Sequence, residues 1–131
     1  MQFNNLFNKT FTTHLNFSQE DINNFAEISG DNNPIHIDLE FAAKSKFGKT
    51  IAHGMLVYAV INEYLSKEFP QSMEISQTLS FLNPVFVEEE LLLVQEVIAV
   101  EPDEEKLEVK TTVTKLDGKV ACQSLTILKL S

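Results

Sequence analysis

The sequence contains no arginine and no tryptophan, and its only cysteine is Cys122. Contacts between basic side chains and phosphates dominate binding to nucleic acids, so a chain without arginine and with a net charge of −9 is not expected to have a nucleic-acid partner. A lone cysteine cannot form an internal disulfide, which favours the cytoplasm as its location. No apolar run is long enough to span a bilayer, and Met1–Asn5 lacks a basic signal-peptide start, so no membrane association is expected.

Patterns that hold metals or phosphates are also missing. There is no cysteine pair, no His-x-x-x-His and no acidic loop of the calcium type, so no metal site is predicted. No glycine-rich phosphate loop and no Ser or Cys nucleophile motif is present. What remains is a chain of 131 residues with a hydrophobic fraction of 44%, which is typical of an ordinary globular protein and predicts one domain over residues 1–131.

The first half of the chain has the spacing of helices. Ser18 followed by Asp21 forms a short acidic capping box, which predicts a helix that ends at Gly30. A second, short helix is predicted over residues 39–46. Residues 55–69 form the most apolar helix, and because apolar side chains cover most of its circumference we expect it to be buried almost all round.

The second half has the alternation of strands. Polar and apolar residues alternate along residues 107–115, and Asp117-Gly118 predicts a tight turn that joins this strand to the last one. An antiparallel sheet packed on one apolar helix is an α+β architecture. Such a sheet leaves an unpaired edge and an apolar flank, which a dimer would cover. Strands are predicted over residues 11–17, 73–81, 91–100, 107–115 and 119–130.

The segment from Gly30 to His36 carries the most informative polar residues. Asp31 and His36 are five residues apart, a spacing that puts them together neither on one face of a helix nor on one side of a strand. Gly30 and Pro34 restrict the segment to a shaped loop. A carboxylate and an imidazole held by such a loop can act as an acid/base pair on one water. Alone, Asp31 is more simply interpreted as a cap or turn residue, and His36 as an ordinary hydrogen-bonded histidine.

A second polar cluster, His53-Gly54, stands at the start of the apolar helix. The first amides of a helix have no internal partner and lie at its positive end, where they can stabilise a developing negative charge. Alternatively, Gly54 only permits tight packing and His53 only shapes the start of the helix. Lys44, Lys46 and Lys49 form the densest basic patch, which could meet phosphates, although a solvated helix end is the interpretation we favour.

These residues resemble a known family. The segments 25–36, 42–43 and 51–55, with their Gly-Asp-x-Asn-Pro-x-His and His-Gly-Met motifs, are similar to the MaoC-like group of hot-dog proteins. Within that group the resemblance is strongest to the R-specific enoyl-CoA hydratases, also called hydratase 2. The order and separation of the motifs make the combination specific.

The resemblance implies a hot-dog fold, in which an antiparallel sheet wraps around a long central helix, and a homodimer with sites near the subunit interface. It implies reversible syn addition of water to a trans-2-enoyl-CoA, giving an (R)-3-hydroxyacyl-CoA. Asp31 and His36 would be the catalytic dyad, and the Gly54 amide would bind the thioester oxygen. Asn33 and His53 would support the site. No cofactor is implied, because the thioester itself acidifies C2 and coenzyme A is part of the substrate.

Two further expectations concern the surroundings of the dyad. Members of this group often carry a small hydroxyl residue one to two turns into the central helix. Asn62 stands at about that place here, and we expect it to support the dyad by hydrogen bonding to Asp31. Phe81, Leu82 and Tyr58 are candidates for the walls of an acyl pocket.

Three other functions remain open. The same dyad could serve a dehydratase that acts on thioesters of acyl carrier protein, although an acidic surface suits an acidic carrier protein less well. A hot-dog thioesterase would use a carboxylate on or near the central helix, for which Glu63 is the candidate, and would leave the Asp31/His36 pair without a role. A non-catalytic hot-dog subunit usually lacks the Asp or the His, and both are present here.

Overall fold

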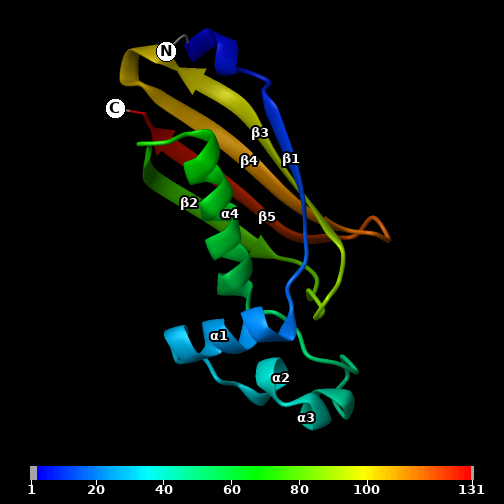
Figure 1. Ribbon diagram of the computed structural model, residues 1–131. Helices are drawn as coiled ribbons and strands as arrows, with labels where there is room; N and C mark the ends of the chain where they lie inside the picture. The colour runs from blue at the N-terminus through cyan, green and yellow to red at the C-terminus, as the bar shows by residue number, and fades with distance from the viewer. Residues whose placement is uncertain (1–2, 131) are drawn as a thin grey trace.

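The computed structural model describes residues 3–130, so Met1, Gln2 and Ser131 lie outside the described residues, together with part of the start on which no signal peptide was predicted. Five strands form one antiparallel sheet in the order β1-β3-β4-β5-β2 (Figure 1). All five predicted strands are confirmed, with small shifts at their ends. The strands are β1 (Thr10–Leu15), β2 (Met73–Phe81), β3 (Leu91–Glu101), β4 (Lys106–Lys115) and β5 (Val120–Lys129).

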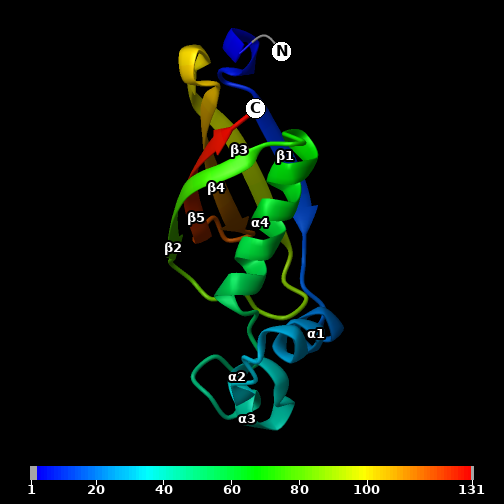
Figure 2. The same cartoon turned by 90° about the vertical axis from the view of Figure 1, so that its left-hand side faces the viewer.

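The helices occupy two places relative to this sheet. The longest helix, α4, lies across the concave face of the sheet, while α1, α2 and α3 gather beyond one end of it (Figures 1 and 2). The two chain ends lie near the opposite end of the sheet. The helices are η1 (Phe3–Leu6), α1 (Gln19–Ser29), α2 (Pro34–Ile37), α3 (Leu39–Ala43), α4 (Gly54–Glu68) and η2 (Pro102–Glu104).

Helix α1 has the ends that the sequence predicts. The Ser18 hydroxyl accepts a hydrogen bond from the Asp21 amide, and the Asp21 carboxylate accepts one from the Ser18 amide, both at 3.0 Å. These two bonds satisfy amides that a helix start leaves unpaired. At the other end Gly30 takes a φ of 81°, a left-handed conformation that costs glycine little, and the helix stops there.

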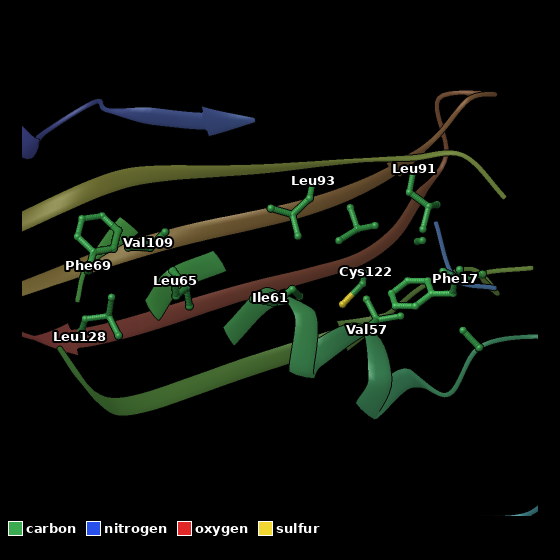
Figure 3. Packing of buried hydrophobic residues seen from close by; sticks show 14 of the residues in the cluster. Phe17, Val57, Ile61, Leu65, Phe69, Leu91, Leu93, Val109, Cys122 and Leu128 are labelled. Carbon is green, nitrogen blue, oxygen red and sulfur yellow. The ribbon is translucent and has the colours of Figure 1, made fainter. Parts of the chain in front are cut away.

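Helix α4 is fixed by one apolar stripe. Val57, Ile61 and Leu65 recur every fourth residue, are buried, and pack against inward-facing residues of the sheet (Figure 3). The prediction that this helix is buried almost all round is wrong for the described chain, because Met55 is 52% exposed and Ala59 is also exposed. The reason is architectural: one sheet covers one flank of the helix, and no second layer of the chain covers the other.

The sheet contributes the other half of the core. Along β4 the side chains alternate between buried and half-buried positions, as the sequence predicts, and Leu107, Val109 and Val113 face the helix. The turn at Asp117-Gly118 is also confirmed, and Gly118 has a φ of 88°. Strand β2 forms one edge of the sheet.

None of the helices in residues 3–130 has the length and apolar character that a bilayer crossing requires.

Shortening the central side chain of the α4 stripe tests this description of the core. Ile61 is fully buried, so Ile61→Ala removes apolar contacts and leaves a cavity. We expect it to lower the free energy of unfolding by about 2–5 kcal/mol, measured by urea denaturation. Ser66→Ala, at an exposed position of the same helix, should change it by less than about 0.5 kcal/mol. Equal effects of the two substitutions would contradict the assignment of the buried face.

Candidate active site

The segment that carries Asp31 and His36 is part loop and part helix. Its sequence predicted a loop throughout, but residues Pro34–Ile37 form the short helix α2, so His36 lies on a helical turn. Asn33 is the N-cap of this helix, and its side-chain oxygen accepts a hydrogen bond from the Ile35 amide at 3.1 Å. Pro34 suits the first helical position, because it has no amide hydrogen to leave unpaired and its φ is already helical.

Asp31 and His36 face each other across a short gap. Asp31 Oδ2 lies 3.9 Å from His36 Nε2, while Asp31 Oδ1 accepts a hydrogen bond of 3.4 Å from the Asn33 amide. The gap exceeds the length of a direct hydrogen bond, but one water oxygen at about 2.8 Å from each group would bridge it. The Asp31 side chain is 56% exposed and the His36 side chain 12% exposed, so the pair is open to solvent on the carboxylate side.

A main-chain contact determines which nitrogen of His36 is free. His36 Nδ1 lies 2.8 Å from the carbonyl oxygen of Ile51, which can only accept a hydrogen bond. Nδ1 therefore carries the hydrogen in the neutral ring, and the lone pair is on Nε2, the atom that faces Asp31. The geometry thus presents an unprotonated nitrogen and a carboxylate oxygen to the same point.

His53 completes a cluster with these two residues. It occupies the N-cap position of α4, is 2% exposed, and stacks on His36 with ring centroids 3.8 Å apart and planes at 24°. Its Nε2 lies 2.9 Å from the main-chain oxygen of Asp31, so this nitrogen carries the hydrogen and donates it. Phe25 of α1 packs edgewise on the same ring at 4.9 Å. His53 therefore not only stands at the start of the helix but also contacts Asp31, His36 and Phe25.

Burial decides the charge of His53. Removal of the ring from water lowers the pKa of His53, and the nearby His36 lowers it further, whereas the hydrogen bond to the Asp31 carbonyl raises it. Within residues 3–130, Nδ1 of this ring is buried and has no hydrogen-bond partner. His53 is therefore a neutral donor through Nε2 rather than a second cation beside His36.

Two polar residues that the sequence did not single out hold the backbone of His36. Gln19, at the start of α1, donates from Nε2 to the His36 carbonyl oxygen at 2.8 Å. The Thr50 hydroxyl donates to Gln19 Oε1 at 2.6 Å, and Thr50 is fully buried. The positions of Gln19 and Thr50 in the sequence do not predict these hydrogen bonds, because the bonds join three segments that meet only in the folded chain.

A largely apolar cavity of about 330 Å³ opens beside the dyad. Of the three predicted walls, Phe81 and Leu82 line it, but Tyr58 does not and instead donates a hydrogen bond to Glu74 at 3.1 Å. A concave, mostly apolar space with few polar groups is the usual form of a small-molecule site. The residues that bear most on its chemistry are His36, Gly54, Val57, Phe81, Leu82 and Cys122.

Buried polar contacts fix the loop that follows β2 and forms one wall of this cavity. The Lys115 ammonium donates to the Pro84 carbonyl oxygen at 2.6 Å and pairs with Glu89 Oε1 at 3.3 Å. It also lies over the Phe86 ring at 4.6 Å from the centroid. Cys122 lines the same cavity from β5, and burial raises the pKa of its thiol to about 11, so Cys122 remains a neutral, weakly reactive thiol.

The position of Gly54 is compatible with both interpretations of its role. A Cβ atom at this position would lie 3.0 Å from the Phe81 ring, so glycine permits a close contact between the start of α4 and that ring. Gly54 is also the first residue of α4 and lines the cavity, where an amide of the first turn has no internal partner. The packing and the free amide are compatible, because they involve different sides of the same residue.

Asn62 does not reach Asp31 in this chain. It lies eight residues beyond Gly54, or about 12 Å along the helix at the usual rise, and no hydrogen bond between Asn62 and Asp31 occurs in the described chain.

The lysines of the basic patch make different kinds of contact. Lys44, with a side chain 77% exposed, pairs with Glu40, and Lys49 lies over the Phe86 ring.

The three side chains of the Asp31, His36 and His53 cluster are of metal-ligating types. Asp31, His36 and His53 each bring one possible ligand atom within 4.8 Å of the others. The sequence predicted no metal site, because these residues do not have the spacing of a metal motif. Their cluster arises from the fold, and three protein ligands is the number that catalytic zinc sites use.

The fold and the site together define a class: a hot-dog protein in which a carboxylate faces an imidazole, and the imidazole lines an apolar cavity at the start of the central helix. Residues 3–119 match the family model described as "MaoC like domain". The chain belongs to the MaoC-like family, which confirms the resemblance and the predicted hot-dog fold.

Three similar proteins are informative. The (R)-specific enoyl-CoA hydratase of Aeromonas caviae is 34% identical over 116 residues, 87% of this chain and 87% of that protein. A mitochondrial 3-hydroxyacyl-[acyl-carrier-protein] dehydratase of Arabidopsis thaliana is 40% identical over 94 residues, 72% of this chain but only 57% of that protein. The solved (R)-hydratase structure from A. caviae has a TM-score of 0.90 at 31% identity and covers 95% of this chain and 96% of the other. Both named activities are those of hydro-lyases, which confirms the predicted enzyme class.

The lowered pKa of His53 has a consequence for stability. The unfolded chain takes up a proton on this residue near its ordinary pKa of 6.5, and the folded chain only at lower pH. The contribution of neutral His53 to the free energy of unfolding is therefore fully present above about pH 6.5. It is lost as the pH falls toward the pKa of His53 in the folded chain, by up to about 1.4 kcal/mol per pH unit.

His53→Gln removes this titration. Between about pH 6.5 and 5 we expect the free energy of unfolding of the wild type to fall more steeply than that of the variant, measured by urea denaturation at each pH. Ser66→Ala, which replaces an exposed side chain of α4 that does not titrate, should follow the wild-type slope. Parallel curves for the wild type and His53→Gln would contradict the description of His53 as a buried neutral ring.

Proposed function

We propose that this protein catalyses the reversible hydration of a trans-2-enoyl-CoA to an (R)-3-hydroxyacyl-CoA. The observation that carries the proposal is the pair Asp31 Oδ2 and His36 Nε2, 3.9 Å apart and next to the apolar cavity. A pair at this separation can hold one water between a base and a carboxylate, and the cavity suits an acyl chain. The named activity of the A. caviae relative supports the same reaction.

In the proposed reaction the water sits between the two groups. The Asp31 carboxylate accepts a hydrogen bond from one O–H of the water and orients it, and this hydrogen stays on the oxygen. The lone pair on His36 Nε2 takes the other proton as the oxygen bonds to C3. The resulting imidazolium returns that proton to C2, so both new bonds form on one face of the double bond. Asp31 stabilises the transient positive charge on His36. Each step uses only groups of the chain and of the thioester, and no cofactor is part of the proposal.

The start of α4 supplies the second half of the proposed site. Addition to C3 moves negative charge onto the thioester oxygen until C2 is protonated. Gly54 lines the cavity at the positive end of α4, where its amide, aimed at that oxygen, would stabilise the enolate. Asn33 supports the reaction indirectly, because its cap of α2 holds the turn that carries His36.

The carrier of the acyl group distinguishes this proposal from its nearest alternative. A dehydratase acting on acyl-carrier-protein thioesters would use the same dyad, and the named activity of the A. thaliana relative favours it. A net charge of −9 counts against an acidic carrier protein as a partner. The thioesterase alternative has less support, because Glu63 is exposed, pairs with Lys67 at 3.2 Å, and does not line the cavity.

We also propose that the protein forms a homodimer. The free edge strand β2 has exposed apolar side chains at Met73 and Ile75, and Met55 on α4 is exposed as well. Pairing two β2 edges would satisfy the unpaired backbone groups and bury these side chains. Sedimentation equilibrium tests this proposal: a mass of two chains supports it, and a single-chain mass at all concentrations contradicts it.

Replacement of either member of the dyad is the direct test of the proposed chemistry. With trans-2-butenoyl-CoA and longer enoyl-CoA substrates, we expect Asp31→Asn and His36→Gln each to lower kcat by about 10²–10⁴, because each removes one acid/base group. The loss of the conjugated thioester absorbance measures the rate, and chiral analysis of the product tests the R configuration. His14→Gln should keep the wild-type rate.

The same assay separates the alternatives. A wild type that is inert with all enoyl-CoA substrates but active on acyl-carrier-protein thioesters would transfer the proposal to the carrier-protein dehydratase. Release of free thiol would indicate a thioesterase. A dyad variant that keeps its full rate would overturn the residue assignment, and a rate abolished by a chelator and restored by a metal ion would overturn the cofactor-free mechanism.

A matched pair of substitutions tests the Gly54 amide. Gly54→Ala adds a Cβ near Phe81 but keeps the amide hydrogen, whereas Gly54→Pro adds similar bulk and removes it. Proline suits the first helical position, and His53 already has the extended ψ of 139° that a following proline requires. We expect kcat of the Pro variant to be about 10²–10³ lower than that of the Ala variant. Equal rates would leave Gly54 a packing residue only.

A further inference from the structure

His53 is the N-cap residue of α4 but does not cap the helix with its side chain. N-cap positions favour Ser, Thr, Asp or Asn, whose side-chain oxygens accept amide hydrogens of the first helical turn. His53 makes no such cap bond, although it is the N-cap of α4. A buried polar ring that neither caps the helix nor satisfies its own Nδ1 is costly, so its other contacts must account for it.

Those contacts connect the two halves of the dyad. The Nε2–H of His53 donates to the main-chain oxygen of Asp31, and the face of the same ring lies against His36. Asp31 belongs to the loop after α1, His36 to α2 and His53 to the start of α4, so one ring joins three segments.

We propose that His53 is a positioning residue for the Asp31/His36 pair: its hydrogen bond fixes the main chain of Asp31, and its ring fixes the plane of His36. This inference rests on the proposed function and adds to it the residue that sets the spacing of the dyad.

The bonds that the dyad loop makes for itself are too weak to set this spacing. Asp31 is held locally by the Ser29 hydroxyl at 3.1 Å and by a long bond to the Asn33 amide at 3.4 Å. Both partners are exposed, so water competes with each bond. The bond from His53 is shorter, at 2.9 Å, and starts from a ring that is almost completely buried. It is therefore the better anchor for Asp31.

The charge state of His53 suits this role. The groups that face its ring are His36 on α2, Phe25 on α1 and Asp31 in the loop, and of these only His36 and Asp31 can carry charge. A neutral His53 stacked on His36 does not oppose the positive charge that His36 gains when it takes the proton of water. A charged ring at 3.8 Å would oppose it.

Two substitutions separate the hydrogen bond from the ring. His53→Phe keeps an aromatic ring for stacking but removes the donor. His53→Gln removes the ring but keeps an N–H donor at a similar distance from the main chain. His14→Gln is the control, at an exposed position of β1. All three are compared with the wild type for kcat, KM, pH profile and urea stability.

For a positioning residue we expect His53→Phe to lower kcat by about 10²-fold with KM nearly unchanged, because a displacement of the dyad by about 1 Å misplaces the water but leaves the acyl pocket intact. His53→Gln should recover part of this loss. Variants that keep the wild-type kcat, or whose kcat falls only in proportion to the folded fraction, would overturn the proposal. So would a Gln variant that is no better than the Phe variant.

A spectroscopic measurement keeps this test independent of the proposed function. In the wild type the ring ¹⁵N shifts of His36 should report one neutral tautomer with the hydrogen on Nδ1, because of the bond to Ile51. We expect His53→Gln, which removes the stacked ring, to let His36 tilt away from Ile51 and mix its tautomers. His53→Phe, which keeps a stacked ring, and His14→Gln should leave them unchanged. Unchanged His36 shifts in the Gln variant would overturn the positioning role, even for a protein that proved inert toward every enoyl thioester.

Discussion

The packing of α4 on the concave face of the sheet is the constraint on which the site depends. Val57, Ile61 and Leu65 pack against the sheet and fix the helix along one direction, with its start toward α1, α2 and α3 (Figures 1 and 3). That direction brings His53 and Gly54 next to the segment that carries the dyad. The polar groups of the site are therefore positioned by an apolar contact that lies some distance from them.

A small set of polar contacts then converts this arrangement into a site with defined protonation. Main-chain oxygens of Ile51 and Asp31 accept from His36 and His53, and each bond selects one tautomer of its ring. The free lone pair of His36 consequently points to Asp31. Gln19 and Thr50 hold the backbone behind it. The reactivity that we propose follows from these bonds more than from any unusual residue.

The sequence predicts those features whose cause is local. The capping box of Ser18 and Asp21, the stop at Gly30 and the alternation along β4 depend on neighbours in the chain, and the structure confirms each. Helix α2 also has a local cause, since Asn33 is its cap and Pro34 its first residue, and attention to this pattern would have replaced the predicted loop by a helical turn.

Features with a distant cause were not predictable in this way. The stacking of His53 on His36, and the support from Gln19, join segments that meet only after folding. The burial of α4 was overestimated, because composition shows that a helix is apolar but not how many layers cover it. The absence of a hydrogen bond between Asn62 and Asp31 in residues 3–130 likewise depends on where the helix begins relative to the dyad.

The central claim is that Asp31 and His36 act on one water from one side of the substrate. The most direct measurement is hydration of a trans-2-enoyl-CoA in D₂O, followed by determination of the relative configuration at C2 and C3 of the product. The account predicts a single diastereomer in which deuterium and hydroxyl have added to the same face. Addition to opposite faces, or a mixture at C2, would require a second proton donor across the substrate and would contradict it.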